Sequence, residues 1–117
     1  MATSKIASKR SILWTGNSNT KDTDVTVALN GSYTGYSNLA LIFADVSSST
    51  NVIAESIVPV SALAESTPTG VRTTAFGATH YYVQLNRVSD TSLQIRSGQL
   101  TALAGYSLYL KRIEGFN

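Results

Sequence analysis

The chemistry that this sequence offers lies in its tyrosines and small polar side chains, because the residues of common catalytic sites are scarce. His80 is the single histidine and cysteine is absent, so neither a cysteine nucleophile nor a zinc site built from several His and Cys ligands is available. No glycine-rich phosphate loop or dinucleotide-binding fingerprint occurs. We therefore expect no enzyme activity, no catalytic residues, no cofactor and no metal site, and a structural or surface role for His80.

The seven acidic residues are scattered, and no spacing favours any one pair. A glycan-modifying enzyme stays an alternative only if two of Asp24, Glu55 and Asp90 meet at about 5–10 Å, the separation of paired carboxylates in glycoside hydrolysis. Asp22 and Asp24 share one face of a predicted strand, which is typical of a solvated strand entry.

Four of the six tyrosines are candidates for ligand contact, namely Tyr33, Tyr36, Tyr81 and Tyr109. Tyr33 and Tyr36 stand in a predicted loop that contains glycine, whereas strand alternation directs Tyr109 away from its apolar neighbours and Tyr81 opposite to Tyr82. Exposed tyrosine offers rigid contact area at low entropic cost. The alternative for each is a ring packed in the core with its hydroxyl reaching a loop.

Composition and charge describe one folded domain. The length of 117 residues suits about one domain, and an apolar content of 43% excludes disorder. No apolar run approaches the roughly 18 residues of a membrane-spanning helix. The net charge is +2, and basic residues cluster only within Lys5–Arg10 and Lys111–Arg112. We therefore expect no binding to nucleic acid.

Alternation with a period of two predicts an all-β fold. It runs through Asp24–Leu29, Tyr81–Asn86, Ser92–Arg96 and Tyr106–Lys111, which is typical of half-buried antiparallel strands. Leu39–Ala44 is apolar at every position and predicts a central strand covered on both faces. About eight short strands at roughly ten-residue spacing predict a single antiparallel β-sandwich that is jelly-roll-like.

Turn residues and proline set the other boundaries. They predict a first strand over Ser11–Thr15 with a turn over Thr15–Asn19, a strand over Val52–Val58 stopped by Pro59, and a helical turn over Ser61–Glu65 capped by Ser61. They also predict a loop over Ser66–Gly70, a turn over Phe76–Ala78, a hairpin turn over Ser89–Thr91 and a strand that starts after Ala104-Gly105. We expect residues 1–10 to form a flexible basic arm and residues 11–117 to form the sandwich.

The order of several segments is similar to that of a known kind of domain. Ile12–Gly16 opens the series, a Thr-rich strand ending in Leu29 follows, and then come Gly35–Phe43, Ser56–Pro59 and Leu108–Phe116. This series resembles the small β-sandwich head domains at the C-termini of bacteriophage tail fibres and baseplate-associated receptor-binding proteins. The resemblance spans about Ile12 to Phe116, with Glu114 where an aromatic residue is usual and Phe116 where an aliphatic one is usual.

The resemblance implies adhesion to a host cell. It implies a virion protein of the tail, and so extracellular, that binds a saccharide or an outer-membrane component, contacts other virion proteins and forms a homotrimer. No ligand residue is carried over, because binding in such domains lies in variable loops. Since a sandwich must protect its edge strands, we expect the first or last strand, Ile12–Thr15 or Leu108–Ile113, at a subunit contact that includes Tyr109.

The alternative is a structural virion component, such as a capsid decoration or tail-assembly protein. In that case the cations Lys5, Lys9 and Arg10 would dock the arm on an acidic shell. Deleting residues 1–9 separates the two hypotheses, because only the structural component depends on the arm for attachment.

Overall fold

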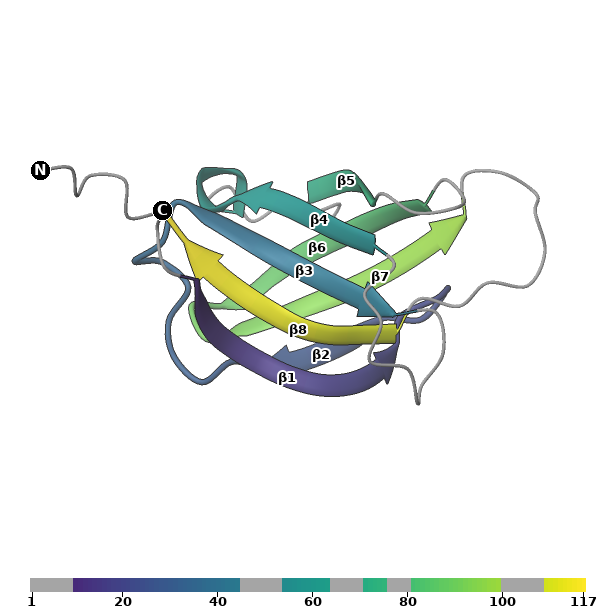
Figure 1. The fold of residues 1–117 in the computed structure, drawn as a ribbon, viewed down its shortest axis with the longest axis horizontal. Helices are drawn as coiled ribbons and strands as arrows, with labels where there is room; N and C mark the ends of the chain where they lie inside the picture. The colour runs from purple at the N-terminus through teal and green to yellow at the C-terminus, as the bar shows by residue number, and fades with distance from the viewer. Residues whose placement is uncertain (1–9, 45–53, 64–70, 76–80, 100–108) are drawn as a thin grey trace, which may run out of the picture.

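Two four-stranded antiparallel sheets pack face to face in the computed structural model, which describes residues 10–44, 54–63, 71–75, 81–99 and 109–117 (Figure 1). Sheet A has the strand order β1 (Ser11–Asn19), β8 (Tyr109–Phe116), β3 (Asn38–Ala44) and β4 (Ala54–Pro59). Sheet B has the order β2 (Val25–Ala28), β7 (Ser92–Gln99), β6 (Tyr81–Ser89) and β5 (Val71–Ala75). A short 3-10 helix, η2 (Val60–Leu63), follows β4.

The chain changes sheets between β1 and β2 at a corner tied to β7. Lys21 pairs with Ser97 in a parallel bridge, and the buried hydroxyls of Thr20 and Ser97 lie 2.8 Å apart. Asp22 then adopts a φ of 51°, a left-handed conformation that Asp tolerates better than most residues and that turns the chain back toward β2. The corner therefore satisfies its buried polar groups before the second sheet begins.

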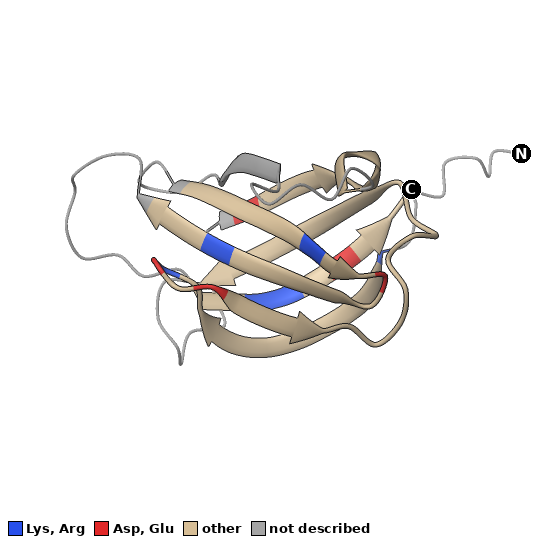
Figure 2. Cartoon of the chain, turned by 180° about the vertical axis from the view of Figure 1, so that it is seen from behind, with Lys and Arg blue, Asp and Glu red and all other residues tan. Residues whose placement is uncertain are grey.

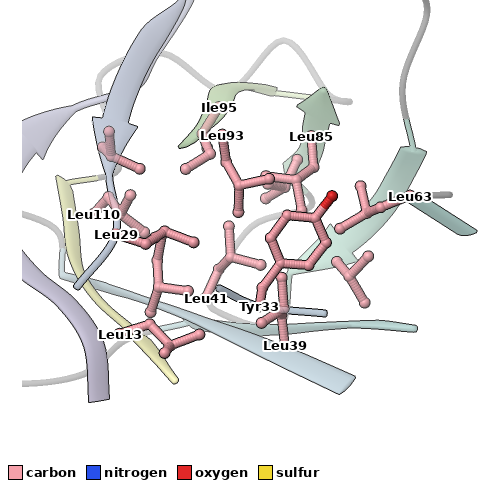
Figure 3. Close-up of a cluster of buried hydrophobic side chains, with 14 of the residues drawn as sticks. Leu13, Leu29, Tyr33, Leu39, Leu41, Leu63, Leu85, Leu93, Ile95 and Leu110 are labelled. Carbon is pink, nitrogen blue, oxygen red and sulfur yellow. The ribbon is translucent and has the colours of Figure 1, made fainter. Parts of the chain in front are cut away.

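The core lies between the sheets and consists of the alternate side chains that point inward. Figure 3 shows part of this cluster. It contains Leu13, Val27, Leu29, Tyr33, Leu39, Leu41, Phe43, Val58, Leu63, Val83, Leu85, Leu93, Ile95, Leu110 and Ile113. Both sheets contribute, so each buries one apolar face against the other.

Strand β3 is buried on its outer face as well. Ile42 points away from sheet B, yet only 3% of it is exposed. Arg10 helps to cover this face, because its Nη1 lies 3.0 Å from Oε2 of Glu55 on β4 and 3.3 Å from Oε1 of Glu114 on β8. These two strands flank β3, so the guanidinium crosses over β3, where Ala40 is small enough to leave room.

Arg10 therefore belongs to the folded domain rather than to the arm in which the sequence placed it. Its guanidinium also lies 4.7 Å from the centroid of the Phe116 ring, a cation–π contact. Hydrogen bonding to Glu55 raises the pKa of Arg10, partial desolvation opposes the rise, and Glu114 adds to it. Residues 1–9, for which a flexible arm is predicted, lie outside the described residues.

The predicted fold class is confirmed, since the structure is an all-β antiparallel sandwich with eight strands in its described residues. Leu39–Ala44 is the fully buried central part of β3, as expected. The hairpin at Ser89–Thr91 is also confirmed, although β6 and β7 extend beyond their predicted lengths. The predicted loop over Ser66–Gly70 and turn over Phe76–Ala78 lie outside the described residues, as does the start of the last strand near Ala104.

The turn predicted over Thr15–Asn19 is wrong, because β1 continues without interruption to Asn19. The pairing of β1 with β8 shifts register between Thr15 and Ser18, so a bulge absorbs the residues that resembled a turn. Gly16 has a packing role here, since a Cβ at this position would overlap the ring of Trp14.

Other boundaries differ by shorter amounts. The helical turn begins at Val60 rather than at Ser61 and ends at Leu63. The strand expected from Val52 is described from Ala54 and includes Pro59 as its last residue, on an edge of sheet A where a missing N–H is tolerated. The last strand is not an edge, because β8 lies between β1 and β3. Strand β5 has no counterpart in the sequence-based expectations.

Because the two faces of β3 are buried differently, substitutions at adjacent residues are expected to lower the free energy of unfolding by different amounts. Leu41→Ala empties a site between the sheets and is expected to lower the free energy of unfolding by about 2–5 kcal/mol. Ile42→Ala opens a site just beneath the outer surface, which water can fill after the substitution, so the expected loss in the free energy of unfolding is roughly half as large or less. Urea denaturation measures both. An equal or larger loss for Ile42→Ala would contradict this account of the outer face.

Candidate functional site

One end of the sandwich carries an open cleft of about 450 Å³ where three segments meet. Tyr33 and Thr34 come from the loop between β2 and β3, Val60 and Ser61 come from η2, and Arg87 and Asp90 come from the β6–β7 hairpin. The cleft therefore combines hydroxyl groups, one ion pair and one aliphatic side chain.

Backbone hydrogen bonds hold the three segments together. The Tyr33 N–H donates to the Asp90 carbonyl at 3.1 Å, which ties the loop to the hairpin. The Val60 N–H donates to the Ser37 carbonyl at 2.9 Å, which ties η2 to the end of the same loop. These hydrogen bonds fix the backbone positions that carry the side chains of the cleft.

Tyr33 forms the inner wall of the cleft. Only 2% of the residue is exposed, and Figure 3 shows its ring among Leu39, Leu63 and Leu85. The ring therefore contributes mainly to the core, and the structure agrees with the packed alternative for most of this side chain. Tyr33 lines the cleft as well, so the sequence-based proposal of ligand contact applies to its outer edge.

Arg87 and Asp90 form the charged mouth of the cleft. Arg87 Nη2 lies 2.6 Å from Asp90 Oδ1, and the two side chains are 33% and 56% exposed. Hydrogen bonding to Asp90 and then to the Tyr33 hydroxyl raises the pKa of Arg87, so the guanidinium stays charged. The pair is solvated, so its value for stability is small and its importance lies in the donors and acceptors it presents.

The other predicted tyrosines do not join Tyr33 in the cleft. Tyr36 is half-buried at the same end of the sandwich, where a Cβ on Gly115 would stand 2.7 Å from two of its ring carbons. Its ring therefore packs on β8. Tyr109 and Tyr81 begin β8 and β6, so they lie at the opposite end. The side chain of Tyr81 lies outside the described residues.

The acids singled out from the sequence do not converge. Asp24 lies 3.6 Å from Arg96 beside sheet B, Glu55 lies on the outer face of sheet A, and Asp90 lies at the cleft. In Figure 2 the charged positions are spread over strands and turns, and acidic positions do not gather in one place. The described residues contain no group of three or more metal-ligating side chains. His80 lies outside the described residues.

Four of the six cleft residues were not predicted as ligand contacts from the sequence: Thr34, Val60, Ser61 and Arg87. Asp90 was predicted only as a turn residue and as a possible carboxylate partner. One signal was present for Arg87, because it occupies the position that follows Val83 and Leu85 in the inward alternation of β6. Its strand partner is the fully buried Leu93. A charge at an inward position near a strand end indicates that the core opens there.

Comparisons with known proteins give no match. No protein-family model, curated protein or solved structure matches the chain. Among the described residues, no helix has the length and apolar character needed to cross a membrane.

The double role of Tyr33 can be tested by two substitutions. Tyr33→Phe keeps the ring and removes the hydroxyl, so we expect a loss of about 0.5–1.5 kcal/mol in the free energy of unfolding. Tyr33→Ala removes the ring from among its leucine neighbours, so we expect a loss of about 3–5 kcal/mol. Both are measured by urea denaturation. If the two variants are equally stable, the ring is not part of the core.

Proposed function

We propose that this chain is a receptor-binding head of the kind found on bacteriophage tail fibres or baseplates, and that it binds a host-surface saccharide in the cleft. The observation that supports this function is the grouping of Arg87, Asp90 and two hydroxyl side chains around an aliphatic wall at one end of a rigid sandwich. The resemblance of the segment order supplies the virion setting.

The side chains of the cleft match the chemistry of a sugar ring. A sugar hydroxyl both donates and accepts hydrogen bonds, so it needs both kinds of partner. Arg87 donates, Asp90 accepts, and the hydroxyls of Thr34 and Ser61 do either. Val60 offers an apolar surface to the C–H groups of the ring.

Rigid support strengthens this proposal. The β6–β7 hairpin carries Arg87 and Asp90 on a two-strand frame, and the frame continues into the core through Leu85 and Leu93. Because the backbone is already ordered, little conformational entropy is lost when a ligand is bound. A small loss of entropy matters for sugar binding, because each hydrogen bond from the sugar to the protein replaces an equally good hydrogen bond to water.

Self-association is part of the same proposal, with the outer face of sheet A as the contact and a second copy of this chain as its partner. Ile12 and Ile57 are 51% and 40% exposed on this face, in one register row with Glu114 and Ala40. Between them the charges cancel, since Arg112 lies 2.7 Å from Glu114 and Arg10 contacts both glutamates. Because each glutamate is paired with an arginine, a contact through this face would bury no unpaired charge.

The outer face of sheet B has a different character. There Asn86 donates an amide hydrogen bond of 3.0 Å to Gln94, and the neighbouring outward positions of β6 and β7 include Gln84 and Arg96. Apart from the exposed Val88 near the hairpin, these polar side chains favour water over a second protein. Association through sheet A in a homotrimer would combine several weak cleft sites into one stronger attachment.

A structural virion component is the second candidate function, and the position of Arg10 is the observation that favours it. Arg10 is fixed on the outer face of sheet A by Glu55 and Glu114, and the arm of residues 1–9 joins the domain there. A protein lacking residues 1–9 that folds but no longer attaches to particles would support this candidate. Retained host-cell binding by the same protein supports the receptor-binding head.

The role of the cleft predicts a selective loss of cell binding. Pull-down of the fluorescently labelled protein on a panel of bacterial strains should detect at least one host strain. Arg87→Ala should then reduce the retained protein by about tenfold or more, because a charged hydrogen-bond donor is lost. The matched control is Arg96→Ala, which removes an arginine paired with Asp24 outside the cleft. Failure of the unmodified protein to bind any strain, or equal losses in both variants, would contradict the proposal.

The association face predicts a change in mass. Native mass spectrometry should show a trimer for the unmodified protein and monomers for the double variant Ile12→Ser/Ile57→Ser, because the variant loses the exposed apolar contacts of sheet A. Tyr109→Ala, on the same face, should act in the same direction. Val88→Ser is the matched control, since Val88 is also an exposed aliphatic residue but lies near the hairpin. A monomeric unmodified protein would contradict the trimer.

A further inference from the structure

The cleft carries no net charge, although its mouth is made of two charged groups. Arg87 and Asp90 neutralise each other at 2.6 Å, and the remaining lining residues are Tyr33, Thr34, Val60 and Ser61. Its electrostatic preference therefore depends on which of the two charged groups a ligand meets first.

Asp90 is the more exposed of the two charged groups. Its side chain is 56% exposed, against 33% for Arg87. Arg87 Nη2 already lies 2.6 Å from Asp90 Oδ1, so its positive charge is directed at a partner within the chain. A ligand carboxylate that approached Arg87 would have to displace the Asp90 carboxylate or lie beside it, and like charges at such short range repel.

A neutral hydroxyl has no such conflict. It can accept from the guanidinium and donate to the carboxylate without disturbing the bond between them. Two adjacent hydroxyls of a pyranose ring can divide these roles, with Ser61 and Thr34 available for a third hydroxyl. An undisturbed ion pair thus fits an uncharged sugar better than an acidic one.

We infer that the cleft selects uncharged hexose units of a surface polysaccharide and excludes uronic and other acidic sugars, with the Asp90 carboxylate as the excluding group. This inference rests on the proposed function, because it names the class of saccharide that the same cleft binds. Asp90 acts as a specificity-determining residue: its charge rejects the acid, and its acceptor oxygen binds the neutral sugar.

The test uses sugars that differ at a single carbon. Galactose and galacturonic acid share their ring hydroxyls and differ only at C6, which is a hydroxymethyl carbon in galactose and a carboxylate carbon in the acid. Glucose with glucuronic acid and mannose with mannuronic acid form equivalent pairs. Each is titrated at millimolar concentrations into the ¹⁵N-labelled full chain, and the amide shifts of Ser61, Arg87 and Asp90 are followed. We expect at least one neutral hexose to shift these amides, and its acid to bind about tenfold more weakly or worse.

Asp90→Asn removes the charge and keeps the shape and an acceptor oxygen. In this variant the acid should gain about tenfold in affinity relative to the neutral sugar. Asp24→Asn, which removes the matching carboxylate beside Arg96, should leave the ratio between the two sugars unchanged. The comparison of neutral and acidic sugars on the unmodified protein needs no variant, so it remains decisive if Asp90→Asn does not fold.

The outcomes separate the two levels of the proposal. If an acid binds the unmodified protein as tightly as its neutral partner, the selectivity is wrong while the saccharide cleft stands. If Asp90→Asn folds and still rejects the acid, Asp90 is not the excluding group. If none of the six sugars shifts the cleft amides, the proposed saccharide site is itself overturned, and the selectivity with it.

Discussion

The burial of both faces of β3 is the constraint on which the rest of the structure depends. A strand in an antiparallel sandwich normally has one face in the core and one in water, yet Leu39–Ala44 is excluded from solvent on both. Sheet B covers one face. Side chains from the flanking strands cover the other, together with the Arg10 guanidinium that bridges Glu55 and Glu114. Arg10 and β8, which are about a hundred residues apart in the sequence, therefore meet over the most buried strand.

The cleft follows from how this central strand is entered. The loop that leads into β3 has to close the end of the core, and it does so with the ring of Tyr33. Beyond that ring the inward row of β6 continues for one more position, which is Arg87. Arg87 is one-third exposed at this end of the row, and its guanidinium pairs with the hairpin carboxylate of Asp90. The charged mouth of the cleft, Arg87 and Asp90, thus lies where the apolar core between the two sheets ends.

Local patterning was sufficient for the elements whose burial follows from their own residues, either because every position is apolar or because apolar and polar positions alternate. Leu39–Ala44 and the hairpin around Ser89–Thr91 were predictable for this reason. The continuation of β1 through Gly16 was not, because the bulge depends on the register with β8, about a hundred residues away. Strand β5 was not predictable either, since Val71–Ala75 is short and mostly polar, and its pairing with β6 defines it.

The site was less predictable than the fold for a related reason. Tyr33 and Asp90 were each noted in a loop or a turn, but nothing local indicates that the Tyr33 N–H bonds to the Asp90 carbonyl. Tyr36 was expected to face a ligand because of its loop, whereas a glycine on the last strand leaves it a place to pack. Contacts between distant segments decide which tyrosine serves the core and which reaches the cleft.

The glycines beneath aromatic rings have a consequence for how this domain can change. Trp14 covers Gly16 and Tyr36 covers Gly115, each ring occupying the volume that a methyl group at the glycine would need. Neither member of such a couple can vary alone: enlarging the glycine expels the ring, and shrinking the ring uncovers the backbone beneath it. Divergent descendants of this chain should therefore exchange the two residues of a couple jointly, and a single replacement would leave behind a defect that a second one has to repair.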